Sequence, residues 1–416
     1  MRETFKSLSI FSAMLMILLV ISTGCDINIP GCGKRSLPFF KQILPNQTNN
    51  SQTFNNTLSN NTASNPQNST NSSMNLNTLS KPVLATPTAT AVLVDVEKIA
   101  YTTIEEGQPT LWTMNTDGTE RTRLTTLKTS SWHPLWSPNG KILAFLSTAS
   151  DGKVNLYTIQ KGSATLTQIT SWEDMSKPDP AVLQAPFSWS PKSDQIAYIY
   201  KNQIWVVSLD TLEQSTLVTV DPAFTISTVS WAPHRDNKYI AYTVLGGTNY
   251  SSVLLVNPRL KDQLHLADSR VLIPSITWTS GAEELAYLSD NRAVYTTKVE
   301  DTTSQPLING ASPDLAPYIS FSPVDSSTRL LLLARQSTDD SGYRVAVVDK
   351  PAKGDNDTGT LKYLTPAGVD SAVWSPDGTK IAYVTSGELW IMDSTSGMFK
   401  TRIALTGIQS PDWSRK

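Results

Sequence analysis

Histidine is the scarcest side chain of this sequence that commonly serves as a general acid or base, with three copies in 416 residues. His133 lies between Trp132 and Pro134, whereas His234 is expected in a hairpin turn and His265 in a polar loop. No two of them have the spacing of paired metal ligands. The Gly-x-Ser-x-Gly, His-Glu-x-x-His and phosphate-binding glycine motifs are all absent. We therefore expect a binding protein rather than an enzyme, with no metal and no cofactor.

Cys25, one of two cysteines near the N-terminus with Cys32, carries the clearest chemical signal. Two basic residues precede an apolar run at residues 10–21, and Ser22-Thr23-Gly24 then leads into Cys25. This order is typical of a bacterial signal peptide, and a run of about 12 residues is short for a membrane-spanning helix of about 20. The segment resembles a lipobox, which implies cleavage after residue 24, acylation of Cys25 and anchoring at the extracytoplasmic face of a membrane. The alternative is an ordinary cysteine beside a conventional cleavage site.

Residues 25–92 have the composition of a tether. No charged residue occurs from Gln42 to Ser80, and 12 asparagines lie between Asn46 and Ser80. Such a polar segment lacks the apolar side chains needed to form a core. The sequence therefore predicts a disordered stalk between the lipid anchor and a folded domain at residues 93–416.

The folded part is built from a repeat that returns seven times. Each copy contains an aromatic residue in a Trp-Ser-Pro context, a tight turn, an Ile-Ala-Tyr strand and a further apolar strand. The aromatic positions are Trp136, Trp189, Trp231, Trp278, Phe321, Trp374 and Trp413. Four short strands per period of about 45 residues are typical of a β-propeller blade. The sequence thus predicts an all-β, seven-bladed propeller of four-stranded antiparallel blades, in which most tryptophans pack between strands.

The two ends of the repeat array complement each other. The last copy stops at Trp413-Ser414, whereas the first begins at Ile99-Ala100-Tyr101 without a preceding Trp-Ser-Pro unit. Pairing of the C-terminal strand with the N-terminal strands would complete a seventh blade and remove two exposed sheet edges. We therefore expect a closed, monomeric ring.

Aligned at the same offset before the aromatic residue, the copies supply a set of candidate mouth residues. If the ring closes, these positions surround one opening of the channel. They combine hydroxyl, amide and imidazole groups with one carboxylate, which suits hydrogen bonding to a peptide or sugar but offers no acid pair for glycosidic chemistry. The candidate binding residues are His133, Ser275, Tyr318, Asp370 and Gln409. Two long insertions, residues 171–185 and 350–361, are further candidate contact surfaces.

The run Trp374-Ser375-Pro376-Asp377-Gly378, continued by Ile381-Ala382-Tyr383, resembles the WD-like propeller repeat of the TolB family. The resemblance covers about 320 residues. It implies a propeller that binds envelope proteins. Propellers of the prolyl-oligopeptidase type are also similar, but they carry a hydrolase domain, which we do not expect after the last repeat.

Charge and composition narrow the possible partners. The 34 Lys and Arg residues are balanced by 36 Asp and Glu residues, which argues against nucleic acid binding. The leading hypothesis is a membrane-anchored lipoprotein whose propeller binds envelope proteins or ligands. The alternatives are a lyase or hydrolase that uses His133 at the channel mouth and a regulatory module that senses a small ligand.

Overall fold

The computed structural model describes residues 96–416 except for short gaps at 127, 149–151, 173–185, 235–238, 248–249, 290–291, 301, 309–313, 325–326, 336–341, 351–357 and 405–406. Cys25, the signal peptide and the predicted stalk lie outside these residues, as does most of the two predicted insertions. The described elements are all β-strands, and none of these residues forms a helix long and apolar enough to cross a membrane.

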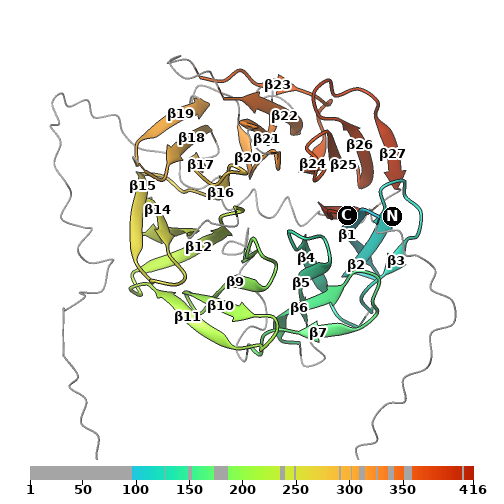
Figure 1. Cartoon of the computed structure of the whole chain (residues 1–416). Helices are drawn as coiled ribbons and strands as arrows, with labels where there is room; N and C mark the ends of the chain where they lie inside the picture. Colours follow the sequence, from blue (N-terminus) through green and yellow to red (C-terminus); the bar gives the residue numbers. More distant parts are fainter. Residues whose placement is uncertain are drawn as a thin grey trace, which may run out of the picture. The chain divides into compact units, whose positions relative to one another are not determined.

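The described strands form seven four-stranded antiparallel sheets arranged as blades of a ring (Figure 1). The innermost strands are β4 (Ser131–Trp136), β8 (Phe187–Trp189), β12 (Phe224–Trp231), β16 (Ser275–Trp278), β20 (Leu315–Phe321), β24 (Val369–Trp374) and β28 (Ile408–Trp413). The second strands are β5 (Ile142–Thr148), β9 (Gln195–Tyr200), β13 (Ile240–Gly246), β17 (Glu284–Ser289), β21 (Arg329–Ala334), β25 (Lys380–Thr385) and β1 (Lys98–Glu105).

The outer half of each blade consists of a third and a fourth strand. The third strands are β6 (Val154–Gln160), β10 (Gln203–Ser208), β14 (Tyr250–Val256), β18 (Ala293–Lys298), β22 (Arg344–Asp349), β26 (Glu388–Asp393) and β2 (Gln108–Asn115). The fourth strands are β7 (Leu166–Gln168), β11 (Gln214–Thr219), β15 (Gln263–Ser269), β19 (Ser304–Ile308), β23 (Lys362–Tyr363), β27 (Thr401–Ala404) and β3 (Thr122–Arg123). We number the blades 1 to 7 in the order of their innermost strands.

Blade 7 closes the ring as the sequence predicts. Its order is β28-β1-β2-β3, so the last strand of the chain pairs with the first. Trp413 lies opposite Ile99 in this antiparallel pair, and Asp412 lies opposite Ala100. The backbone N–H of Ser414 extends the closure by donating to the carbonyl of Lys98 at 2.8 Å. The expected seven-bladed, closed propeller is therefore confirmed.

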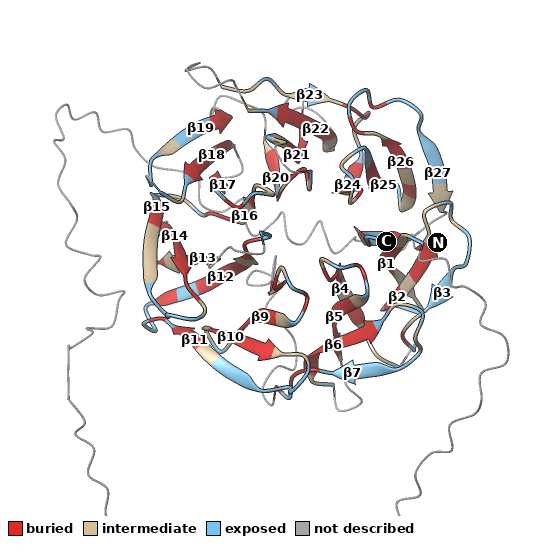
Figure 2. Cartoon of the chain, viewed as in Figure 1, coloured by how far each residue is buried: buried red, intermediate tan, exposed pale blue. Residues whose placement is uncertain are grey.

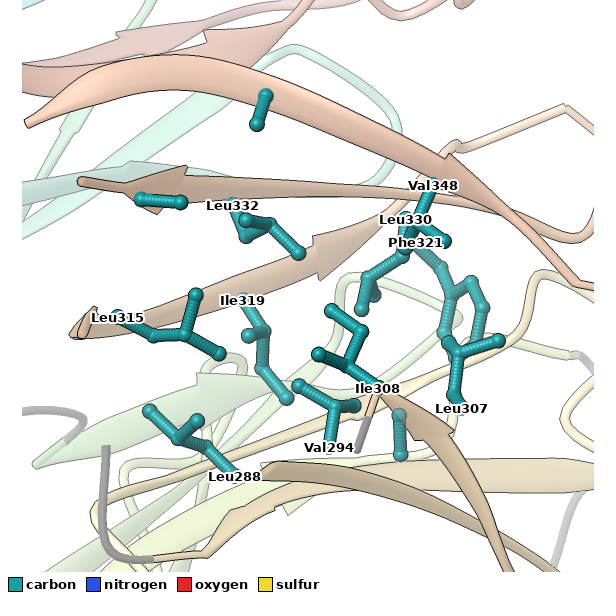
Figure 3. Packing of buried hydrophobic residues seen from close by; sticks show 13 residues of the cluster. Leu288, Val294, Leu307, Ile308, Leu315, Ile319, Phe321, Leu330, Leu332 and Val348 are labelled. Atoms are coloured by element: carbon teal, nitrogen blue, oxygen red, sulfur yellow. The ribbon is translucent and has the colours of Figure 1, made fainter. Parts of the chain in front are cut away.

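The core lies between neighbouring blades. Figure 3 shows one such layer, in which Leu288 and Val294 of blade 4 pack against Ile319 and Leu332 of blade 5. Burial decreases outward in most blades, and every residue of the short fourth strands β3 and β7 is exposed (Figure 2). Continuous apolar runs in the second strands explain this pattern, because each blade is covered on both faces by its neighbours.

The repeated tryptophans fix the spacing of the blades. The indole Nε1 of Trp189 donates to the carbonyl of Leu135 at 3.0 Å, and that of Trp374 donates to the carbonyl of Ser320 at 3.0 Å. Trp278 makes the equivalent bond to Ser230 at 3.1 Å. Each of these bonds joins one blade to the preceding one. The predicted packing role of the tryptophans is thus confirmed, and the contacts of Trp189, Trp278 and Trp374 each include a hydrogen bond to the preceding blade.

The prediction for His265 was wrong, because this residue lies in strand β15 rather than in a loop. The apolar positions Leu264 and Leu266 alternate with polar residues there, which is the pattern of a half-buried outer strand. Its ring Nε2 lies 2.9 Å from Oδ1 of Asp268. His234 does lie just after β12, at the exposed start of the connection to β13.

Candidate functional site

The predicted mouth residues gather at one end of the innermost strands. All blades repeat the same strand order, so their innermost strands run in one direction and begin at the same rim of the channel. His133 lies near the start of β4, Asp370 near the start of β24 and Gln409 near the start of β28. We call this end the His133 rim. The opposite end, where the Trp-Ser-Pro units terminate these strands, is called the Trp136 rim.

Bulges shape the His133 rim. Five innermost strands, β4, β12, β20, β24 and β28, lose their regular pairing within a few residues of this rim. His133 lies in the bulge of β4 with a positive φ of 54°, and Asp370 is the extra residue in the bulge of β24. A bulge releases a residue from the hydrogen-bonded ladder and changes the direction of its side chain. The same irregularity thus recurs around the rim where the sequence predicts a binding site.

The other predicted residues occupy related positions. Tyr318 lies in the bulge of β20, and Gln409 directly precedes the bulge of β28. Ser275 is the first residue of β16, where it pairs with Leu288. Gln409 and Asp370 are exposed, whereas Ser275, Tyr318 and His133 are partly buried. Partial desolvation by the surrounding strands raises the pKa of the Asp370 carboxyl above its usual value.

The structure also reveals a pocket at the Trp136 rim that sequence reasoning missed. It is an open pocket of about 200 Å³ at the ends of the innermost strands of blades 5, 6, 7 and 1. Indole, phenyl and proline side chains form most of its wall, together with two serines. Asp412 and Arg415 are its ionisable lining residues.

Asp412 occupies a position with a repeated structural role. In blades 2 and 4, the residue before the aromatic position accepts a hydrogen bond from the backbone N–H of the aromatic residue in the next blade. Ser188 Oγ accepts from Trp231 at 2.9 Å, and Thr277 Oγ1 accepts from Phe321 at 3.4 Å. At the ring closure, Asp412 Oδ2 accepts from the Trp136 N–H at 2.5 Å. A carboxylate therefore stands where other blades use a neutral hydroxyl.

The surroundings of Asp412 disfavour its charge. Burial raises the pKa of its carboxyl to about 7, although hydrogen bonds from the backbone amides of Trp136 and Trp413 oppose this rise. Within the described residues, no Lys, Arg or His side chain forms an ion pair with it. Burial likewise raises the pKa of Tyr318 to about 12, and the negative charge of Asp412 adds to this effect. The charge of Asp412 therefore acts on Tyr318, one of the predicted residues of the His133 rim.

A signal for Asp412 was available in the sequence. The column immediately before the aromatic residue reads Leu135, Ser188, Ser230, Thr277, Ser320, Val373 and Asp412. Asp412 is the only ionisable residue in this column. Alignment of the copies at this offset, rather than three and four residues upstream, would have identified it.

The His265–Asp268 pair does not have the arrangement of a hydrolytic triad. The Ser252 hydroxyl donates to Asp268 Oδ1 at 2.8 Å. The serine is therefore hydrogen-bonded to the carboxylate and not to the imidazole. In a triad, the histidine stands between serine and carboxylate. The pair also lies on β15, the outermost strand of blade 3. Among the described residues, no three His, Cys, Asp or Glu side chains gather as metal ligands would.

Comparison with known proteins supports the fold. No protein-family model matches the sequence, and no curated protein matches it. Among solved structures, an oligogalacturonate lyase in complex with manganese matches with a TM-score of 0.55 and 13% identity, over 74% of this chain and 84% of that chain. A prolyl endopeptidase matches with a TM-score of 0.51 and 14% identity, over 76% of this chain and 50% of that chain. TolB from Acinetobacter baumannii matches with a TM-score of 0.49 and 18% identity, over 77% of this chain and 67% of that chain.

These similarities concern the propeller alone. The identities are too low to transfer a ligand or a reaction, and this chain spans about half the length of the prolyl endopeptidase. The seven four-stranded blades seen in the structure agree with the propeller fold that the sequence resemblance implies.

Proposed function

We propose that this chain is an exported bacterial lipoprotein, anchored through Cys25, whose propeller binds a protein or peptide of the cell envelope without catalysing a reaction. The observation that carries the proposal is the bulged His133 rim. There, five innermost strands turn from regular pairing at the positions that bear mixed polar side chains. Loops and strand ends on a rigid scaffold are common locations of binding residues.

The chemistry of the rim favours binding over catalysis. Asp370 is the only carboxylate among the predicted rim residues, so glycosidic cleavage by two acids has no second partner in this set. Imidazole, hydroxyl and amide groups can each donate or accept hydrogen bonds to a peptide backbone. A ring of such groups gives orientation and specificity to a bound segment.

The binding proposal is tested by capture from envelope extracts with the full-length chain as bait. Combined substitution of His133, Asp370 and Gln409 by Ala should reduce capture of a specific partner at least tenfold. Substitution of Leu166, Thr167 and Gln168 on the exposed strand β7 is the matched control and should leave capture unchanged. Capture that never exceeds background, or equal capture by both variants, would contradict the proposal.

The anchoring proposal is tested by fractionation of cells. Cys25→Ser should move the protein from the membrane fraction to the soluble fraction, because only a thiol can accept the lipid. Cys32→Ser is the matched control and should remain membrane-bound. Mass spectrometry of the mature N-terminus should detect the acyl groups on Cys25, and an unmodified Cys25 would overturn this part of the proposal.

A further inference from the structure

The pocket at the Trp136 rim contains a carboxylate, Asp412, that forms no ion pair among the described residues, although Arg415 also lines the pocket. Asp412 is partly accessible from the pocket, and its Oδ2 already accepts the N–H of Trp136 at 2.5 Å. Removal of a carboxylate from water is costly unless opposite charge or sufficient hydrogen bonds compensate. The described residues provide backbone donors but no paired cation. A bound cation would complete the site.

The closure of the ring does not require this charge. Ser188 performs the same inter-blade role for Trp231 with a neutral hydroxyl. Ser230 and Ser320 occupy the equivalent positions in blades 3 and 5. An aspartate at this position therefore adds a property beyond the structural hydrogen bond.

The wall of the pocket indicates which cation fits. Trp136, Trp374 and Trp413 contribute to it together with Pro138, Pro323 and Pro376. Calcium takes six to eight oxygen ligands, often several carboxylates, whereas Asp412 is the only carboxylate among the residues that line this pocket. An ammonium group on an alkyl stem suits this wall, because the stem packs on apolar surface and aromatic rings attract the cation. The volume of about 200 Å³ is far above the ~15 Å³ needed for one water.

We propose that the pocket at the Trp136 rim binds a primary ammonium group carried on a short alkyl chain, such as the side chain of a lysine, with Asp412 as its counter-ion. This inference rests on the proposed binding function and adds a ligand class and a second contact site. The site lies at the end of the channel opposite the His133 rim, so a bound partner would contact the Trp136 rim.

The protonation state of Asp412 makes the binding dependent on pH. An ammonium ion pairs with the carboxylate but not with the protonated acid, so affinity rises as Asp412 loses its proton near pH 7. Two other ionisable groups lie near Asp412. Tyr318 from β20 stays neutral over this range, because burial raises its pKa to about 12, and Arg415, which follows β28, lines the pocket. The lining residues from β4 and β24 contain no titratable side chain.

The test is calorimetric titration of the full-length protein with butylammonium chloride at pH 8, followed by tryptophan fluorescence. Butylammonium should bind in a 1:1 ratio, at least tenfold more tightly than 1-butanol or calcium chloride. Its affinity should fall on the order of tenfold from pH 8 to pH 6, as expected for a group with a pKa of about 7. Equal binding of butanol, or tighter binding of calcium, would overturn the proposal.

Two substitutions locate the site. Asp412→Asn retains an oxygen that can accept the Trp136 N–H and should weaken butylammonium binding at least tenfold. Glu213→Gln removes a carboxylate on the exposed turn between β10 and β11, outside both rim sites, and should leave butylammonium binding unchanged. If Asp412→Asn does not fold, Asp412→Ser restores the residue type of blade 2, and the pH dependence of the unaltered protein remains an independent readout. Unchanged affinity in a folded Asp412 variant would refute the assignment.

Two further ligands distinguish a lysine side chain from a chain terminus as the source of the ammonium group. N-acetyl-lysine methylamide presents a side-chain ammonium, whereas alanine amide presents a terminal one, and we expect the lysine derivative to bind more tightly. Capture of an envelope partner is measured in parallel. Capture that depends on the His133 rim without butylammonium binding refutes only this inference, whereas butylammonium binding without any capture refutes the proposed envelope function.

Discussion

At the scale of single residues, one substitution within a repeated unit changes the chemistry of the ring closure. The position before the aromatic residue holds a neutral hydroxyl in blades 2 and 4, and that hydroxyl accepts the N–H of the next blade. Asp412 makes the same bond in blade 7 but carries an ionisable group. The structural role needs only an acceptor, so the charge has an energetic cost that an amide would avoid.

This cost predicts a pH-dependent stability. A carboxyl with a pKa raised from 3.8 to about 7 binds its proton more tightly in the folded state than in the unfolded state. The free energy of unfolding should therefore fall as pH rises from about 4 to about 7 and be constant above. Asp412→Asn should remove this loss and exceed the wild type by about 2–4 kcal/mol at pH 8 but not at pH 4. Urea unfolding at both pH values measures the difference, and equal stabilities at pH 8 would contradict the prediction.

Gly140 shows how the C-terminal tail is fitted to blade 1. Its φ is +70°, and a Cβ there would lie 2.3 Å from the carbonyl oxygen of Arg415. Gly162 has a similar φ of +77°, but a Cβ there would meet only open space, with no neighbour within 4 Å. Gly162→Ala should cost about 1 kcal/mol through backbone strain alone. Gly140→Ala should cost about 1–2 kcal/mol more in urea unfolding, since the tail must move, and an equal cost would show that the tail contributes no stability.

At the scale of elements, the innermost strands do two different things along their length. Their final residues pack between blades and supply hydrogen bonds, such as that from Trp374 Nε1 to Ser320. Their first residues leave the ladder in bulges, as at His133 and Asp370. The end at the Trp136 rim thus stabilises the contacts between blades, whereas the end at the His133 rim exposes polar side chains. The Asp412 pocket is the exception, because it lies at the Trp136 rim.

The tryptophan contacts predict unequal effects of the same substitution. Trp136 Nε1 is buried without a hydrogen-bond partner among the described residues, in contrast to Trp374 Nε1. Trp374→Phe should therefore lower the free energy of unfolding by about 1–2 kcal/mol more than Trp136→Phe, because it leaves the Ser320 carbonyl without its donor. Thermal and urea unfolding of the two variants measure this difference. A larger loss for Trp136→Phe would contradict it.

At the scale of the whole molecule, stability depends on closure of the ring. β28 pairs with β1 although more than 300 residues separate them in the chain, as the 316-residue separation between Lys98 and Ser414 illustrates. The pairing covers the inner edge of β1, which would otherwise be open to another strand. Closure also creates the pocket, since four blades on both sides of the chain ends line it.

Removal of the last strand tests this dependence. Deletion of residues 408–416 should lower the melting temperature by at least about 10 °C, because it removes one strand and opens the ring, and should promote self-association through β1. Deletion of Lys416 alone is the control and should have little effect. Thermal unfolding and size-exclusion chromatography give the readouts. A truncated protein that stays monomeric with an unchanged melting temperature would show that the ring does not need its closing strand.

The repeated residues alone determined the architecture. The aromatic column from Trp136 to Trp413 and the Ile-Ala-Tyr column specify seven blades, because each copy encodes the same strands and turn through local patterns. The unmatched ends at Tyr101 and Trp413 predicted the closure for the same reason. The outermost strands were less predictable, as His265 shows, since each pairs along one edge only and mixes polar with apolar residues.

Tertiary structure decided the properties of the candidate sites. The register within each blade showed that His133 and Asp370 lie in bulges, which depend on pairing with a partner strand. Asp412 lies in a pocket because four blades meet around the ring closure, namely those that begin with β20, β24, β28 and β4. Its raised pKa follows from that burial and not from its sequence neighbours. Local patterns specify strands, whereas the charge environment of a side chain depends on residues that meet only when the ring closes.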